Sequence, residues 1–175
     1  LVYACSCSRS DLQGHVGYPG SCRDKGLPLD NPSYNWRLQL PTAQYVSMID
    51  FEGSISRHPI KAVSGDFVVR RKAENPNQPA LPAYQLACVV DDIHDGTTHI
   101  VRGQDLFESS VLQLYLADLL EAQSFTQIRF EHHALVTGSK GEKLSKSAGD
   151  HKGKSLLEHY SSREELLQAL ELAFS

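Results

Sequence analysis

The sequence has 175 residues, 41% of them hydrophobic, and a formal net charge of −4 at pH 7. This length fits one domain with a substantial core, and the negative charge excludes a general attraction to nucleic acid. Any RNA contact would therefore use local basic patches, such as Arg70 to Lys72 or Lys140 to Lys154. No apolar run is long enough to span a bilayer, and the four cysteines are not a secreted disulfide framework. We expect a cytoplasmic monomer with no membrane partner.

Residues 1–33 are predicted to form a loop-rich knuckle that needs a crosslink, because they are rich in Cys, Gly, Pro, Ser and Asp without periodicity. Cys5 and Cys7 are one residue apart and Cys22 follows in a Gly/Pro loop, so three thiolates can converge on a soft cation such as zinc. On bare chemistry His15 is the better fourth ligand, since imidazole commonly binds zinc. The alternative is three reduced thiols without metal, because Cys-x-Cys is looser than the usual zinc spacings.

Residues 34–137 are predicted to begin with a strand-rich segment. Apolar residues alternate at 36–40 and at 46–48, which indicates short antiparallel strands. The β-rich run from Phe67 to Val69 indicates a further strand. These short elements carry no functional assignment by themselves.

The second part of the same region is predicted to belong to an open α/β sheet. The run from Leu86 to Val90 is apolar on both faces, as in a central parallel strand. It ends at Asp91 and Asp92, where open α/β sheets place their ligand crevice. His99 to Val101 indicates another strand, and Asp105 can cap the helix after it. The broad apolar face of that helix consists of Leu106, Leu112, Tyr115, Leu116, Leu119 and Leu120.

Residues 138–175 contain a loop with two lysines, Lys143 and Lys146, between glycines and serines. Two flexible ammonium groups can follow negative charge onto a leaving pyrophosphate, which predicts a mobile phosphate clamp. The alternative is a solvated basic loop, which is the commoner reading of a generic K-x-x-K. A capping box at 162–165 predicts a final amphipathic helix.

The lysine loop resembles a known signature. Lys143-Leu144-Ser145-Lys146-Ser147 is similar to the KMSKS motif of class I aminoacyl-tRNA synthetases, with Leu in place of Met. Upstream blocks resemble the glutamyl-tRNA synthetase catalytic core in the order that this family uses. These blocks are Gly65 to Arg70, Ala83 to Asp92, Thr98 to Leu106 and His132 to Val136. The pattern C-x-C…Y-x-x-x-C in residues 5–22 resembles the zinc site of glutamyl-queuosine tRNA(Asp) synthetases, where a tyrosine oxygen coordinates.

The resemblance implies a role for each matching residue. Cys5, Cys7, Tyr18 and Cys22 would hold a structural zinc ion, which puts Tyr18 ahead of His15. Arg102 and Tyr84 would bind the substrate glutamate, and Lys146 would contact the phosphates of ATP, bound with magnesium, with help from Lys143. The fold implied is α/β, the second half of a Rossmann-like class I core with a zinc-knuckle insertion.

The function implied is ATP-dependent activation of glutamate and its transfer to tRNA, onto queuosine of tRNA(Asp). One alternative is an ordinary glutamyl-tRNA synthetase that charges the tRNA 3′ end and needs tRNA to activate glutamate. Another is an inactive zinc-binding module that contacts RNA. The HIGH motif of class I synthetases does not occur in the sequence, so we expect a fragment that lacks the N-terminal half of the catalytic domain.

Overall fold

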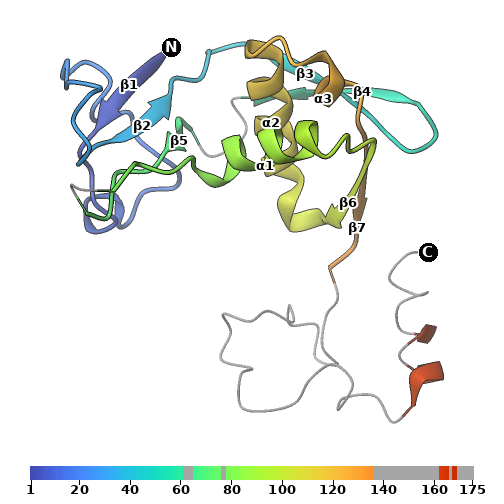
Figure 1. Ribbon diagram of the computed structural model, residues 1–175. Helices are drawn as coiled ribbons and strands as arrows, with labels where there is room; N and C mark the ends of the chain where they lie inside the picture. Colours follow the sequence, from blue (N-terminus) through green and yellow to red (C-terminus); the bar gives the residue numbers. More distant parts are fainter. Residues whose placement is uncertain (61–64, 76–77, 136–161, 166, 169–175) are drawn as a thin grey trace. The chain divides into compact units, whose positions relative to one another are not determined.

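The computed structural model describes residues 1–60, 65–75, 78–135, 162–165 and 167–168, and it divides into two compact units (Figure 1). The first unit comprises Leu1–Ile100 and Glu108–Phe130, and the second comprises Val101–Phe107 and Glu131–Ser175. The strands are β1 (Val2–Cys5), β2 (Asn35–Leu38), β3 (Tyr45–Ile49), β4 (Ile55–Pro59), β5 (Phe67–Arg70), β6 (His99–Gly103) and β7 (Arg129–His133). The α-helices are α1 (Tyr84–His94), α2 (Phe107–Leu119) and α3 (Gln123–Thr126), and short 3-10 turns lie at Ser10–Leu12 and Gln104–Leu106.

The first sheet has the order β1-β2-β5, and both of its pairings are antiparallel. The register between β2 and β5 shifts between Trp36 and Arg37, and Val69 of β5 is the extra residue. Arg37 and its neighbour Leu38 face opposite sides of β2, and both are buried, so this middle strand is covered on both faces there. The strands expected at 36–40 and at Phe67 to Val69 are confirmed.

The second sheet has the order β4-β3-β7-β6. β3 and β4 form an antiparallel hairpin, whereas β3 pairs with β7 in parallel through Ile49 and Arg129. Val46 and Met48 of β3 are buried, as the alternation in that segment predicts. Together the two sheets and the helices make a mixed α/β fold, which agrees with the coarse fold class expected from the sequence.

The predicted parallel strand at Leu86 to Val90 is wrong, because these residues lie in α1. A short apolar run cannot be assigned to a strand or a helix by periodicity alone, and the helix propensities within this run are mixed, since Leu and Ala favour helix whereas Cys and Val do so less. Only Val89 of this helix is buried. Asp91 and Asp92 therefore lie in the last turns of a helix, not at the carboxyl end of a parallel strand.

α2 forms the centre of the core in the first unit. Eight consecutive residues of this helix are buried, from Ser110 to Ala117. Inside this segment Gln113 donates to the side chain of Gln85 on α1 at 3.0 Å, and Gln85 donates to Ser109 at 3.1 Å. These bonds join α1 to α2 and satisfy buried amides that would otherwise cost free energy. The long apolar helix after residue 105 is confirmed, but two residues of its predicted apolar face lie outside it, since Leu106 belongs to the preceding 3-10 turn and Leu120 follows the helix and is exposed.

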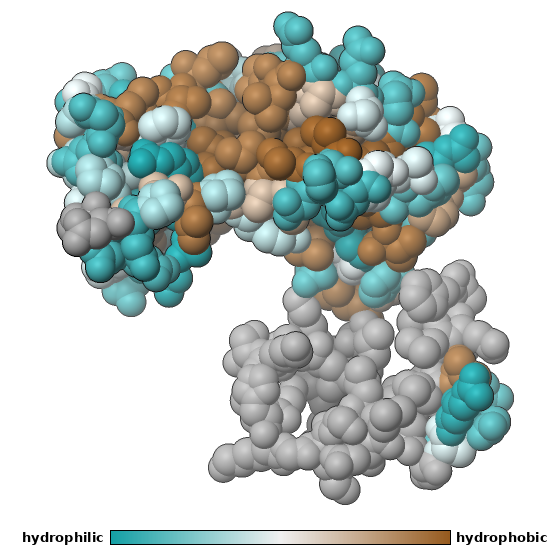
Figure 2. All heavy atoms as spheres, in the orientation of Figure 1, coloured by the Kyte–Doolittle hydropathy of each residue, from teal (hydrophilic) through white to brown (hydrophobic). Residues whose placement is uncertain are grey.

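Apolar side chains are also exposed on the first unit, and Figure 2 shows them gathered around α1 and α2 in the view of Figure 1. Tyr84, Val90 and Ile93 of α1 and Leu120 after α2 are among the exposed large hydrophobic residues. α1 is therefore only partly covered by the described residues. Within those residues, no helix has both the length and the apolar character that crossing a membrane would require.

Candidate metal centre

Three thiols meet at the end of β1. Cys5 ends that strand, Cys7 follows two residues later, and Cys22 lies in a turn after the first 3-10 segment. Their sulfur atoms all lie within 4.8 Å of one another, and Cys7 Sγ is 3.5 Å from Cys22 Sγ. Cys5 and Cys22 are buried, and none of the three is in a disulfide. The spacing of these three cysteines predicted that they converge, and the structure brings their sulfur atoms together.

Tyr18 adds an oxygen to this cluster. Its hydroxyl lies 3.4 Å from Cys5 Sγ and accepts a hydrogen bond from the backbone N–H of Cys22 at 2.9 Å. His15 is exposed and does not belong to the cluster of ligand atoms found in the described residues. Of the two candidates for a fourth ligand, the structure brings Tyr18 to the thiols.

The distances fit the donor set that zinc prefers. Zinc binds sulfur at about 2.3 Å and oxygen at about 2.0 Å in tetrahedral sites. Tetrahedral neighbours are then about 3.8 Å apart for two sulfurs and about 3.5 Å apart for sulfur and oxygen. The Cys7–Cys22 distance of 3.5 Å and the Cys5–Tyr18 distance of 3.4 Å are close to these values. The residues present can therefore hold a zinc ion with only small shifts.

The protonation of the cluster without metal depends on burial and on hydrogen bonds. Burial raises the pKa of the Cys7 thiol to about 11, and its contacts with Cys22 and Cys5 add to this shift. Burial also opposes ionisation of Cys22, but hydrogen bonds from Tyr18, Ser6 and Cys7 outweigh it and lower the pKa of this thiol to about 6. Burial raises the pKa of Tyr18 well above its ordinary value. Cys22 is thus the thiolate that an incoming cation would meet first.

A buried arginine lies against the cluster. Arg37 is 7% exposed, and its Nε donates to Cys5 Sγ at 3.3 Å. Its guanidinium carbon is 3.6 Å from the centroid of the Tyr18 ring. Its Nη1 donates to the backbone oxygen of Asp66 at 2.6 Å, which fixes the group in place. The cluster therefore has a cation held against two of its four candidate ligands.

Asp66 anchors the same region from the other side. Its carboxylate is buried and accepts hydrogen bonds from the Tyr3 hydroxyl at 2.6 Å and from Arg23 at 2.6 and 2.7 Å. It also accepts the backbone N–H of Leu40 at 2.9 Å. Burial opposes ionisation, but these bonds outweigh it and hold the pKa of Asp66 below its ordinary value. Through a single carboxylate, Asp66 thus joins β1, the loop that carries Arg23 and the segment after β2.

Gly65 lets the chain pass close to Tyr18. Its φ is +79°, and a Cβ at this position would lie 2.9 Å from the Tyr18 carbonyl oxygen. We expect Gly65→Ala to lower the free energy of unfolding by about 2–3 kcal/mol, from the backbone conformation and the clash together. Gly14→Ala is the matched control, because Gly14 has φ +83° with nothing within 4 Å of its Cβ position. Urea unfolding measures the free energy of unfolding of both variants, and equal losses would contradict the close approach of Gly65 to Tyr18.

The other predicted site residues lie in different units or outside the described residues. Tyr84 begins α1 in the first unit and is 54% exposed. Arg102 lies in β6, within the second unit, and is partly buried. Lys143 and Lys146 lie outside the described residues. The glutamate and ATP assignments for these residues stay predictions.

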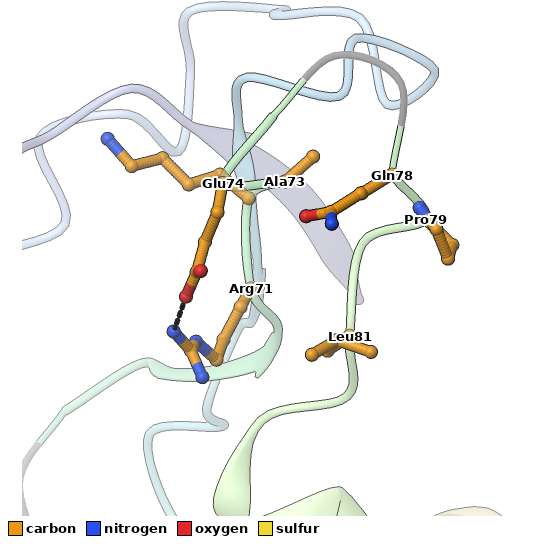
Figure 3. A pocket seen from close by; sticks show the side chains of 7 residues that line it. Arg71, Ala73, Glu74, Gln78, Pro79 and Leu81 are labelled. Carbon is orange, nitrogen blue, oxygen red and sulfur yellow. Dashed lines mark hydrogen bonds and ion pairs between the residues drawn. The ribbon is translucent and has the colours of Figure 1, made fainter.

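Two residues of the basic run from Arg70 to Lys72 contact neighbouring side chains. Arg70 stacks on Trp36, with its guanidinium carbon 4.4 Å from the ring centroid. Arg71 pairs with Glu74 at 2.9 Å, and both groups are more than half exposed, so the pair adds little stability. These two residues line a small pocket with Lys72, Ala73, Gln78, Pro79 and Leu81 (Figure 3). Among its described lining residues, Lys72 adds a cation to the Arg71–Glu74 pair.

The sequence reasoning assigned no role to Arg37 or Asp66, although Asp66 lies in one of the blocks that resemble the synthetase family. A signal was present for Arg37, since a charged residue within a short apolar strand run needs a partner when it is buried. The residues that cover Arg37 are Cys5, Tyr18 and Asp66, all distant in sequence, so its burial has no local marker. Asp66 could have been suspected because Gly-Asp directly precedes a strand.

Comparison with known proteins identifies related chains. The sequence model described as "tRNA synthetases class I (E and Q), catalytic domain" matches residues 33–174. A Glutamyl-Q tRNA(Asp) synthetase of Pseudomonas syringae pv. syringae is 43% identical over 148 residues, which cover 84% of this chain and 46% of that protein. A protein of the same name from Pseudomonas aeruginosa is 42% identical over the same length and coverage. The chain thus spans about half the length of these curated relatives.

Solved structures share the fold. A glutamate-tRNA synthetase from Elizabethkingia anophelis has a TM-score of 0.57 at 20% identity, covering 87% of this chain and 34% of that one. A glutamate tRNA ligase from Elizabethkingia meningosepticum, in complex with its amino acid, also has a TM-score of 0.57, at 21% identity, covering 87% of this chain and 33% of that one. The family match begins at residue 33, so the thiol cluster precedes it.

Proposed function

Because the chain belongs to the family of class I tRNA synthetase catalytic domains for glutamate and glutamine, we propose that it is part of an enzyme that activates glutamate with ATP and transfers it to queuosine in tRNA(Asp). The observation that carries this proposal is the identity of 42–43% to proteins named Glutamyl-Q tRNA(Asp) synthetase. The solved glutamate-tRNA synthetases are too distant in sequence to favour the 3′ end as acceptor, since they share the fold at 20–21% identity.

In the proposed reaction the α-carboxylate of glutamate attacks the α-phosphorus of ATP in line, and pyrophosphate leaves. The attacking carboxylate is already ionised at neutral pH, so this step needs no general base. Arg102 would hold glutamate by two parallel hydrogen bonds to a carboxylate, and Tyr84 would donate a further bond. Lys146, assisted by Lys143, would stabilise the charge on the departing pyrophosphate, and magnesium would accompany ATP.

We further propose that Cys5, Cys7, Tyr18 and Cys22 hold a structural zinc ion. Bound zinc would crosslink the end of β1 to the turn at Cys22, in a region with little regular secondary structure. The support is the convergence of three sulfur atoms and one oxygen at distances close to those of a tetrahedral zinc site.

Glutamate-dependent exchange of pyrophosphate into ATP, without tRNA, tests the proposed activity. The assay is made on the product of the complete reading frame that contains these residues, since the relatives are about twice as long. Exchange without tRNA is the expected result for the queuosine-type enzyme. Exchange only after tRNA is added would support the ordinary synthetase, and no exchange under either condition would support the inactive module.

Arg102→Ala is expected to raise the KM for glutamate in this assay by about a hundredfold, because a charged hydrogen-bonding partner worth about 3 kcal/mol is lost. Arg102→Lys keeps the charge but not the planar guanidinium, so its KM for glutamate should lie between those of the unaltered enzyme and Arg102→Ala. Arg71→Ala is the control, because Arg71 is exposed and pairs with Glu74. An unchanged glutamate KM in Arg102→Ala would remove this residue from the substrate site.

A further inference from the structure

Arg37 is placed to act on the thiol cluster. We propose that Arg37 is a positioning residue for the metal centre, which holds Cys5 and Tyr18 in place and offsets the negative charge of the bound site. This inference rests on the proposed zinc site and adds to it a residue outside the ligand set. Its basis is the pair of contacts that one guanidinium makes, with Cys5 Sγ at 3.3 Å and with the Tyr18 ring at 3.6 Å.

The contacts of Arg37 are directional. Nε donates toward the Cys5 sulfur while Nη1 donates to the Asp66 carbonyl oxygen at 2.6 Å, so two edges of the guanidinium are used. Its flat face covers the Tyr18 ring. A hydrogen bond to a ligand atom from outside the ligand set orients that ligand, and loss of such a bond weakens metal binding by about ten- to a hundredfold.

The charge balance gives Arg37 a second effect. Three thiolates carry three negative charges against the two positive charges of zinc, which leaves an excess of one negative charge. Cys5 and Cys22 are fully buried, so this excess is poorly solvated by water. The fixed positive charge of Arg37, 7% exposed, lies directly beside it. The bound state therefore gains an attraction between this fixed cation and the excess negative charge of the site.

Lysine cannot reproduce both effects. An ammonium keeps the charge but is a compact donor with no flat face, so it cannot stack on Tyr18 while it also bonds to Cys5 and Asp66. Arg37→Lys should therefore retain part of the zinc affinity, and Arg37→Met, which removes the charge at similar length, should retain less. Arg70 is a matched control because it also stacks on an aromatic ring, that of Trp36 at 4.4 Å, away from the thiol cluster.

Zinc affinity is measured by competition with a chromophoric chelator for the unaltered chain, Arg37→Lys, Arg37→Met and Arg70→Met. We expect affinity to fall by about ten- to a hundredfold in Arg37→Met and by less in Arg37→Lys. Arg70→Met should bind zinc as the unaltered chain does. Cobalt(II) replaces zinc as a second probe, and its sulfur-to-cobalt charge-transfer band should weaken or shift in both Arg37 variants. A purely structural role would lower the urea midpoint and leave that band unchanged.

The outcomes separate the two proposals. If the unaltered chain binds neither zinc nor cobalt, the zinc site itself is wrong, and the inference fails with it. If the unaltered chain binds both metals while the Arg37 variants bind them equally well with the same cobalt spectrum, the site stands and the inference alone is overturned. Should Arg37→Met fail to fold by circular dichroism, the cobalt spectrum of Arg37→Lys decides, since this variant keeps the charge.

Discussion

Cys22→Ala is expected to lower the zinc affinity of the chain by at least about a hundredfold. A structural zinc site contributes about 10–16 kcal/mol of binding free energy, so one of four ligands accounts for about 3 kcal/mol. Cys22 is 1% exposed, lies 3.5 Å from Cys7 Sγ and is the thiol whose pKa is lowered to about 6. Its loss removes the readiest thiolate in the cluster. Equilibrium dialysis followed by elemental analysis measures the bound zinc, and thermal unfolding with and without a chelator measures its contribution to stability.

The matched control is Cys88→Ala. Cys88 lies on α1, is partly buried and is outside the thiol cluster, so its loss should leave zinc content unchanged. The chelator should lower the unfolding temperature of the unaltered chain and of Cys88→Ala alike, and have little effect on Cys22→Ala. A zinc affinity of Cys22→Ala equal to that of the unaltered chain would show that Cys22 is not a ligand and that any metal binds elsewhere.

The thiol cluster is the part of the structure that sequence reasoning predicts best. Two cysteines one residue apart and a third in a Gly/Pro loop predicted convergence, although Cys-x-Cys is looser than the usual zinc spacings. The fourth ligand was harder to predict, because ligand chemistry alone favoured His15, whereas the family resemblance favoured Tyr18. The structure brings Tyr18 to 3.4 Å from Cys5 and leaves His15 exposed. Spacing along the chain limits which residues can reach a site, but not which way a side chain turns.

Two failures of the sequence reasoning have identifiable causes. The run from Leu86 to Val90 is helical, and a short apolar run of this kind fits a buried helix as well as a strand. Arg37 was missed because Cys5, Tyr18 and Asp66 cover its side of β2 while the opposite side buries Leu38. The second error arises where contacts distant in sequence decide the outcome, which local patterns do not contain.

Asp66→Asn is expected to lower the free energy of unfolding by about 3 kcal/mol, because it breaks a buried ion pair. The Asp66 side chain is fully buried and accepts bonds from Arg23, Tyr3 and the backbone of Leu40. The amide turns one acceptor oxygen into a donor that faces other donors. The side chain of Arg23 is 39% exposed, so water can hydrate it once the pair is broken. The loss of free energy of unfolding is therefore at the lower end of the range for a buried ion pair. Urea unfolding at pH 7 measures this difference.

The same substitution should change how stability depends on pH. The pKa of Asp66 is below its ordinary value in the folded chain, so its bonds contribute fully above the unfolded-state pKa of about 3.9. Their contribution is lost as the pH falls through the lower folded-state pKa. The stability difference between the unaltered chain and Asp66→Asn should therefore be constant from about pH 7 to about pH 5 and shrink below about pH 4.

Asp91→Asn is the control, because it alters an exposed carboxylate. Its free energy of unfolding should differ little from that of the unaltered chain over the same pH range. A difference for Asp66→Asn that persists unchanged into acid would mean that the carboxylate charge does not hold this region together.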